Sequence, residues 1–141
     1  MQNFIAAKTI LNREGINLVL MKDDRGFQSS DRGIRALLAQ VTGQADWEGA
    51  TAADRIVGKA SAMLYTILGV KEVYAAVLSK PGRAVLEQAG IYYEYGTLTD
   101  NIINRAGTGL CPMEDAVKDI DDPALAVEAL RKRVAELAQG R

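Results

Sequence analysis

The stretch from residue 104 to residue 115 gathers more chemically capable groups than any other part of the chain. It contains the single cysteine, Cys111, an Asn104-Arg105 pair and a Gly-Thr-Gly run at residues 107–109. An arginine can bind a phosphate or a carboxylate through two parallel hydrogen bonds. Backbone N–H groups of a glycine-rich run can approach an anion closely. This stretch is therefore the first candidate for an anion-binding site, and the alternative is a flexible loop with a surface arginine.

Cys111 admits two interpretations. At the beginning of a helix, free N–H groups and the helix dipole stabilise a thiolate, so Cys111 could act as a nucleophile or as a redox-sensitive thiol. Alternatively, Cys111 takes the place of an N-cap, Pro112 is the first helical residue, and Glu114 turns back to a backbone N–H as in a capping box. The spacing favours this structural interpretation. A nucleophile would need Lys59, Lys80 or Glu114 as its base, because the chain contains no histidine.

Asp54 and Lys59 lie within the longest predicted helix, which we place at residues 51–68. Five positions apart, they lie on different faces of such a helix and form no local ion pair. Asp54 shares a face with Gly58, whose missing side chain leaves room for another backbone or for a ligand. Ordinary packing explains this glycine equally well.

The composition restricts the chemistry further. Without histidine and with one cysteine, the chain cannot form a His-assisted nucleophile pair, a His-ligated metal site or a zinc site of several cysteines. Carboxylates could still hold a hard cation. No motif indicates a metal or a cofactor, and we expect none.

Charge and hydropathy predict the compartment and exclude two kinds of partner. The 17 basic and 18 acidic residues give a net charge of −1, whereas a nucleic-acid-binding domain is usually strongly basic. No apolar run approaches the roughly 20 residues that span a bilayer, and residues 1–11 make a poor signal peptide. A single cysteine suits a reducing compartment. We therefore expect a cytoplasmic protein with no nucleic-acid or membrane partner.

Hydrophobic periodicity predicts the elements that must position these residues. Helices are expected at residues 3–13, 34–41, 51–68, 83–88, 111–119 and 122–139, strands at 16–22, 27–30, 71–78 and 91–98, and loops at 42–49 and 79–82.

The element order predicts an α/β fold. The first two strands form a hairpin, and the following helix–strand units are crossovers that make parallel pairs. The strand at 71–78 is apolar on both faces, which indicates a central position. We expect one domain over residues 1–141, with a mixed sheet of about four or five strands and an extra C-terminal helix at about 122–139. Apolar residues on that helix are spaced by three, four and three positions and form a seam that consists of Val127, Leu130, Val134 and Leu137. This seam would pack on the body of the domain or on a partner chain, so a homo-oligomer is possible.

Two segments together resemble an uncharacterised prokaryotic family, domain of unknown function 1893. They are residues 54–62 (Asp-Arg-Ile-Val-Gly-Lys-Ala-Ser-Ala) and the stretch from Asn104-Arg105 through Cys111-Pro112-Met113-Glu114. The resemblance extends from about Ile10 to Leu137. That family is similar in fold to cytidine deaminases, so the resemblance implies a three-layer α/β/α sandwich.

The resemblance does not imply deaminase activity. Deaminases bind zinc through His-x-Glu at the start of the central helix and Pro-Cys-x-x-Cys at the next strand–helix junction. The neighbourhood of Asp54 and the run at residues 79–82 (Ser-Lys-Pro-Gly) occupy these places here, and neither contains a histidine or a cysteine. We expect no zinc-dependent deamination, because a fold does not transfer a function whose site is gone.

By analogy with the deaminase active site, Asp54, Lys59 and Ser79 should lie near one pocket, with the loop at residues 104–114 closing over it. The expected ligand is small and polar or anionic, and a nucleotide-like molecule is one candidate. The protein would act as a sensor or regulatory module. The alternatives are an enzyme with Cys111 as nucleophile and a structural or interaction subunit. The expected ligand-binding residues are Asp54, Lys59, Ser79, Asn104, Arg105 and Glu114.

Overall fold

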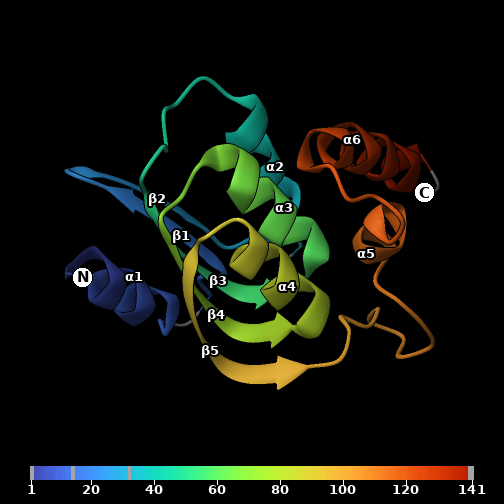
Figure 1. Ribbon diagram of the computed structural model, residues 1–141, viewed down its shortest axis with the longest axis horizontal. Coiled ribbons are helices and arrows are strands. Elements are labelled where there is room, and N and C mark those ends of the chain that lie inside the picture. The colour runs from blue at the N-terminus through green and yellow to red at the C-terminus, as the bar shows by residue number, and fades with distance from the viewer. Residues whose placement is uncertain (1, 14, 32, 140–141) are drawn as a thin grey trace.

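A five-stranded mixed sheet forms the centre of the protein. The computed structural model describes residues 2–13, 15–31 and 33–139 (Figure 1). The strand order is β2-β1-β3-β4-β5; β1 is antiparallel to both of its neighbours, and β3, β4 and β5 are parallel. The predicted hairpin, the parallel crossovers and the approximate number of strands are confirmed. The strands are β1 (Leu18–Lys22), β2 (Arg25–Ser29), β3 (Thr51–Val57), β4 (Glu72–Ser79) and β5 (Tyr92–Thr99).

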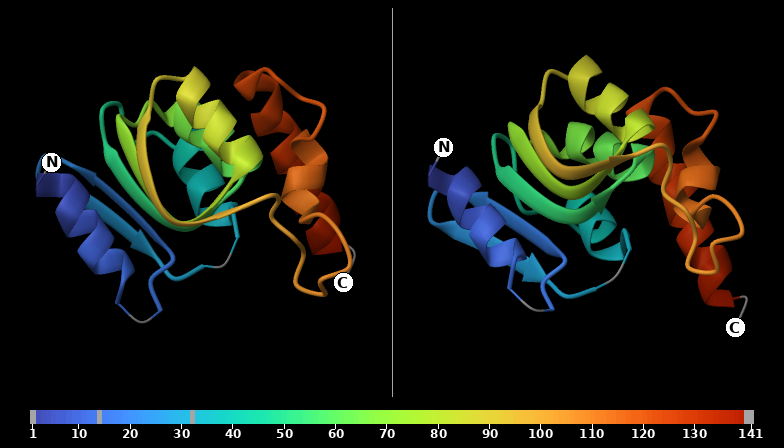
Figure 2. Two further views of the ribbon diagram at one scale, coloured as in Figure 1. Left: turned by 60° about the horizontal axis from the view of Figure 1, so that its bottom comes forward. Right: turned by 90° about the horizontal axis from the view of Figure 1, so that it is seen from below.

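Helices cover both faces of this sheet. Helix α1 (Gln2–Leu11) packs on one face, and α2 (Arg35–Thr42), α3 (Lys59–Leu68) and α4 (Lys80–Gln88) pack on the other (Figure 2). Two separate apolar clusters result, because the side chains of a strand alternate between its faces. This arrangement is consistent with the expected three-layer α/β/α sandwich.

The predicted helix at residues 51–68 is wrong in its first part, because Thr51–Val57 is strand β3. This strand pairs with β1 on one side and β4 on the other. Its Ala52 and Ala53 are fully buried in the two different apolar clusters. Two neighbouring strands satisfy the backbone here, and this tertiary pairing overrides the helix propensity of alanine. Gly58 separates the strand from the true beginning of α3.

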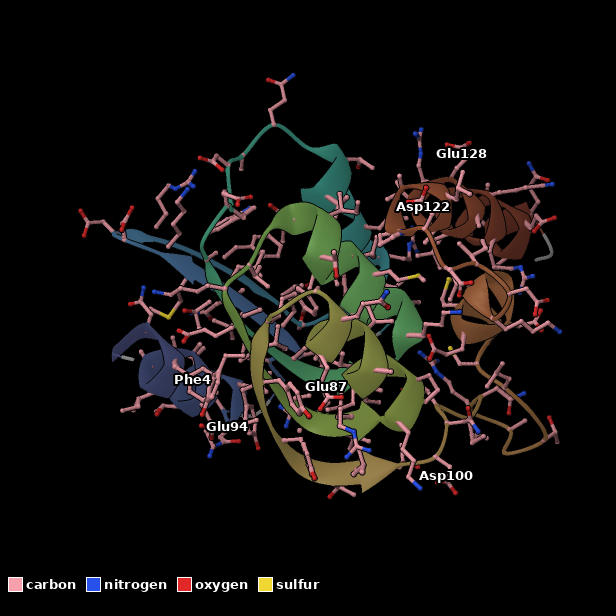
Figure 3. All side chains as sticks on the ribbon, viewed as in Figure 1. Phe4, Glu87, Glu94, Asp100, Asp122 and Glu128 are labelled. Carbon is pink, nitrogen blue, oxygen red and sulfur yellow. The ribbon has the colours of Figure 1, made fainter. Side chains whose placement is uncertain are left out.

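Strand β4 is the central strand that its sequence predicts. Val73 is buried towards the large helical layer, and Tyr74 is buried towards α1. Phe4 of α1, labelled in Figure 3, meets the Tyr74 ring edge-on with 6.4 Å between ring centroids. The two faces of β4 are therefore both covered, as in other α/β sheets.

The predicted loop at residues 79–82 is also wrong, since α4 begins at Lys80. Ser79 is the N-cap of this helix, and its hydroxyl accepts a hydrogen bond from the Gly82 N–H at 3.0 Å. Pro81 in the first turn suits a position where no intrahelical N–H is required. The polar run is thus a helix start rather than a loop.

Two further helices, α5 (Pro112–Val117) and α6 (Pro123–Gln139), follow β5. The predicted seam of α6 packs on the body at Leu130, which is fully buried, whereas Leu137 is 45% exposed. Within the part of the chain that the structure describes, no helix has the length and apolar character needed to cross a membrane.

Candidate functional site

Glu114 reaches from α5 to the first turn of α3. Its Oε1 accepts a hydrogen bond from the Lys59 N–H at 2.7 Å, and its Oε2 accepts one from the Ala60 N–H at 2.8 Å. The predicted capping box is therefore wrong, and the Cys111 N–H donates instead to the Ile102 carbonyl at 2.9 Å. A helix N-terminus presents free N–H groups and partial positive charge, so a buried carboxylate is well placed there.

Gly58 is required by this contact. A Cβ at position 58 would lie 2.2 Å from Glu114 Oε1, and a Cβ at Gly82 would lie 2.9 Å from the carbonyl group of Gly58. The junctions β3–α3 and β4–α4 thus pack backbone against backbone. The room at Gly58 that the sequence indicates is filled by a carboxylate of the same chain and by the neighbouring helix start.

The residue Glu114 is only 7% exposed. Burial raises its pKa above the usual range, and the hydrogen bonds from Ala60 and Lys59, together with the charge of Lys59, oppose that shift. The carboxylate therefore serves mainly to hold α5 against α3.

Lys59 strengthens the same connection from the other direction. Its Nζ donates to the carbonyl oxygen of Lys118 at the C-terminal end of α5, at 3.1 Å. A cation is favourable there because helix C-termini carry partial negative charge. Lys59 and Glu114 together join α3 to α5.

A broad groove of about 1530 Å³ lies between two sets of segments. One set comes from the first half of the chain, and the other comes from the segment after β5 and from α5 and α6, which stand at the carboxyl ends of β3, β4 and β5 (Figure 2). The polar side chains that line this groove are Asn17, Asp31, Arg35, Asp54, Arg55, Ser61, Asn104, Arg105, Cys111 and Glu114.

Asp54 is the ionisable residue of the groove whose acidity is most altered. Burial raises the pKa of its carboxyl to about 7, although a 2.6 Å hydrogen bond from the Tyr65 hydroxyl and backbone N–H groups oppose the shift. The pKa of Tyr65 is raised in turn by its own burial and by the charge of Asp54. A carboxyl of this kind exchanges its proton near neutral pH, so it can either donate or accept a hydrogen bond.

The run at residues 107–109 is an ordered turn rather than an open anion-binding loop. The Gly107 N–H donates to the Asn104 carbonyl at 3.0 Å, and the Thr108 N–H donates to Asn104 Oδ1 at 3.0 Å. The Gly107 φ of +72° explains why a glycine stands at this position. Since these two N–H groups already donate to Asn104, they cannot bind an anion as the sequence predicts. Asn104 instead organises the turn.

Two arginines of the groove carry free charge. Among residues 2–13, 15–31 and 33–139, no carboxylate lies within ion-pair distance of Arg35 or Arg105. Both side chains are exposed and belong to different sets of segments. Arg55, by contrast, donates to the carbonyl oxygens of Leu11 at 2.5 Å and Ile16 at 2.6 Å. It therefore caps the C-terminal end of α1 and is not free to bind a ligand.

Cys111 lies in the groove as the N-cap of α5, and its side chain forms no capping hydrogen bond. The three candidate bases are engaged elsewhere. Lys59 and Glu114 hold α5, and Lys80 pairs with Asp100 at 2.8 Å, just beyond β5 (Figure 3). The N-cap position of Cys111 agrees with the structural interpretation, although Glu114 binds α3 instead of forming the capping box.

The structure therefore gathers some of the predicted site residues and separates others. Asp54, Asn104, Arg105, Cys111 and Glu114 line one groove, whereas Lys59 and Ser79 do not. Ser79 is fully buried as the cap of α4.

Five polar lining residues lie outside the predicted site: Asn17, Asp31, Arg35, Arg55 and Ser61. The polar residues on either side of Gly33, just before and at the start of α2, are the local signal for Asp31 and Arg35. The described residues contain no group of three or more potential metal ligands.

Comparison with known proteins identifies relatives of this chain. The sequence profile of the family described as Domain of unknown function (DUF1893) matches residues 6–134. The crystal structure of a DUF1893 family protein from Thermotoga maritima is similar, with a TM-score of 0.82 and 24% sequence identity over 96% of this chain and 90% of that one. No curated protein matches.

Proposed function

We propose that the groove of this chain, which belongs to the DUF1893 family, binds a small polar or anionic ligand. In this proposal the protein is a cytoplasmic sensor or regulatory module with no zinc-dependent activity. The observation that carries the proposal is the position of Arg105 in one groove with the Asp54 carboxyl.

The exposed arginines of the groove support an anionic ligand. Arg105 and Arg35 are exposed there without carboxylate partners among the residues described above. A guanidinium of this kind can bind phosphate or carboxylate through two hydrogen bonds. Asp54 adds a group that can donate a hydrogen bond when protonated and accept one when ionised.

The position of the groove gives further support. It adjoins the carboxyl-terminal end of β3 and the first residues of α3, and ligands of open α/β sheets bind outside the carboxyl ends of strands. The resemblance of the sequence to a family similar in fold to cytidine deaminases favours a nucleotide-like ligand at this place. The zinc-binding residues of deaminases have no counterpart in a chain without histidine.

A thermal-shift experiment with AMP, CMP, adenosine, cytidine and ribose 5-phosphate at millimolar concentration tests this proposal. A ligand present at 100 times its Kd stabilises the folded state by about 2.7 kcal/mol. We expect an anionic member of the panel to raise the Tm of the wild-type protein and to lose most of that effect on Arg105→Gln.

Arg13→Gln is the matched control, because Arg13 is an exposed arginine outside the groove and its replacement removes the same charge. The control should respond to ligands as the wild-type protein does. Flat melting curves for all five compounds, or equal shifts for Arg105→Gln and the wild-type protein, would contradict the proposal.

A further inference from the structure

Three large apolar side chains are exposed within the groove. Ile56 is 48% exposed, Ile103 is 52% exposed and Leu137 is 45% exposed. They come from the end of β3, from the segment after β5 and from the last turns of α6. A scattered exposed leucine or isoleucine is ordinary on a protein surface, whereas several that line one hollow mark a binding site.

The same groove holds two arginines close to this apolar surface, and neither is paired with a carboxylate of the described residues. Arg105 follows Ile103 by two residues, and Arg35 lies on the opposite set of segments at the start of α2. Binding sites for organic molecules combine mainly apolar walls with a few polar groups that fix the orientation of the ligand. A sugar phosphate or an inorganic anion would leave the apolar part of this groove unused.

We infer that the ligand of the groove is an amphipathic organic anion, with an apolar or aromatic body that covers Ile56, Ile103 and Leu137 and an anionic group bound by Arg105 or Arg35. This inference rests on the proposed function and narrows its ligand class. The volume of about 1530 Å³ exceeds the roughly 300–1000 Å³ that is usual for sites of small organic ligands, so the body has room to lie across the apolar residues.

Isothermal titration of the full chain with three probes tests the inference. The first probe, 1-naphthyl phosphate, has both an anionic and an apolar part. Inorganic phosphate presents the anionic part alone, and 1-naphthol presents the apolar part alone. We expect 1-naphthyl phosphate to bind at least about tenfold more tightly than either of the other two. A tenfold difference is about 1.4 kcal/mol, which corresponds to about 55 Å² of newly buried apolar surface at 25 cal/mol per Å².

Variants locate the apolar contact. Ile103→Ser and Leu137→Ser should each weaken the binding of 1-naphthyl phosphate at least about fivefold and leave phosphate binding unchanged. Two variants are used because Ile103 also belongs to a backbone bridge with Leu110. Leu125→Ser is the matched control, since Leu125 is a 63% exposed leucine of α6 outside the groove, and it should bind like the wild-type protein.

The outcomes separate this inference from the proposed function. Equal binding of 1-naphthyl phosphate and inorganic phosphate, with no effect of the serine variants, would contradict the inference that the ligand has an apolar body. The proposed anion site would then stand without it. Equal binding of 1-naphthol and 1-naphthyl phosphate would overturn the anionic part. A wild-type dimer that does not bind the probes and dissociates on Ile103→Ser would assign the apolar surface to a second copy. Failure of every probe together with flat thermal shifts would overturn the proposed function as well.

Discussion

The Glu114 carboxylate occupies the space that a side chain at position 58 would need. The carboxylate can reach the Lys59 and Ala60 N–H groups only because position 58 has no side chain. The backbone of Gly58, with φ of −104° and ψ of −166°, is a conformation that alanine adopts without strain. The cost of a side chain at position 58 should therefore come from its collision with Glu114.

A double-mutant cycle tests this relationship. Glu114→Ala leaves the buried Ala60 N–H and the partly buried Lys59 N–H without their partner and should lower the free energy of unfolding by about 2–4 kcal/mol. Gly58→Ala should destabilise the wild-type protein by about 2 kcal/mol but cost at least about 1 kcal/mol less in the Glu114→Ala background. Urea unfolding measures all four proteins.

Glu128→Gln is the control for the loss of a glutamate charge. Glu128 is exposed on α6 (Figure 3), with its side chain 80% accessible, and its replacement should change stability by less than about 0.5 kcal/mol. Simple additivity of Gly58→Ala and Glu114→Ala would contradict the shared-space explanation.

Asp54 should make stability fall as the pH rises. Its pKa is about 7 in the folded protein, against an ordinary aspartate value of 3.8. Between these values the unfolded chain has already lost the proton that the folded protein retains, so the unfolding free energy decreases with pH. The stability of the wild-type protein relative to Asp54→Asn should drop by on the order of 3–4 kcal/mol between pH 4 and pH 8.

Urea unfolding of both proteins across this pH range measures the effect. The comparison isolates Asp54, because the other carboxyl groups are common to both proteins. Tyr65→Phe removes the hydrogen bond to Asp54 Oδ2 and should raise the Asp54 pKa further. A constant difference in stability between the wild-type protein and Asp54→Asn would show that the Asp54 carboxyl is well solvated.

At the scale of elements, α6 holds α5 in the position from which Glu114 reaches α3. Arg133 donates to the Pro112 carbonyl at 2.7 Å and to Asp115 Oδ2 at 3.2 Å. Arg133→Ala should lower the free energy of unfolding by about 1–2 kcal/mol, since it removes a partly buried hydrogen bond and ion pair.

Lys132→Ala is the matched control for this prediction. Lys132 is the neighbouring exposed cation of α6, and its replacement should have an effect of less than about 0.5 kcal/mol. Chemical denaturation compares the two variants. Equal stability of Arg133→Ala and Lys132→Ala would mean that α5 is positioned without the arginine.

The element types could be predicted from the sequence nearly everywhere except at β3 and the start of α4. Apolar residues of β3, α3 and their junction follow one apparent helical period, with Ile56 and Val57 preceding Ala60, Met63 and Leu64. Strand pairing on both sides decides the structure of residues 51–57, and no local pattern records it. The β-branched pair followed by Gly58 was the available sign of a break.

The candidate site could be predicted only in part, because its contacts are distant in sequence. Glu114 has the spacing of a local capping residue, yet it caps a helix that begins 55 positions earlier in the chain. Asn104 and Arg105 were selected for their chemical types. Both residues line the groove, and Asn104 also organises the turn at residues 104–108.

At the scale of the whole molecule, the sheet and its helices form one side of the groove, and the chain after β5 forms the other (Figure 2). Neither side alone combines Asp54, Arg105 and the apolar residues. The proposed binding therefore depends on the contacts of Glu114, Lys59 and Arg133 that hold the second side in place.

Backbone amide NMR during titration with the five compounds of the thermal-shift panel tests the central claim most directly. The groove site predicts that an anionic compound shifts amide resonances on both sides of the groove, around Ile56 and around Arg105, and that Arg105→Gln removes these shifts. Resonances of α1, on the far face of the sheet, should stay unchanged. Shifts confined to residues outside the groove, or none with any compound, would contradict a ligand site between these two sides.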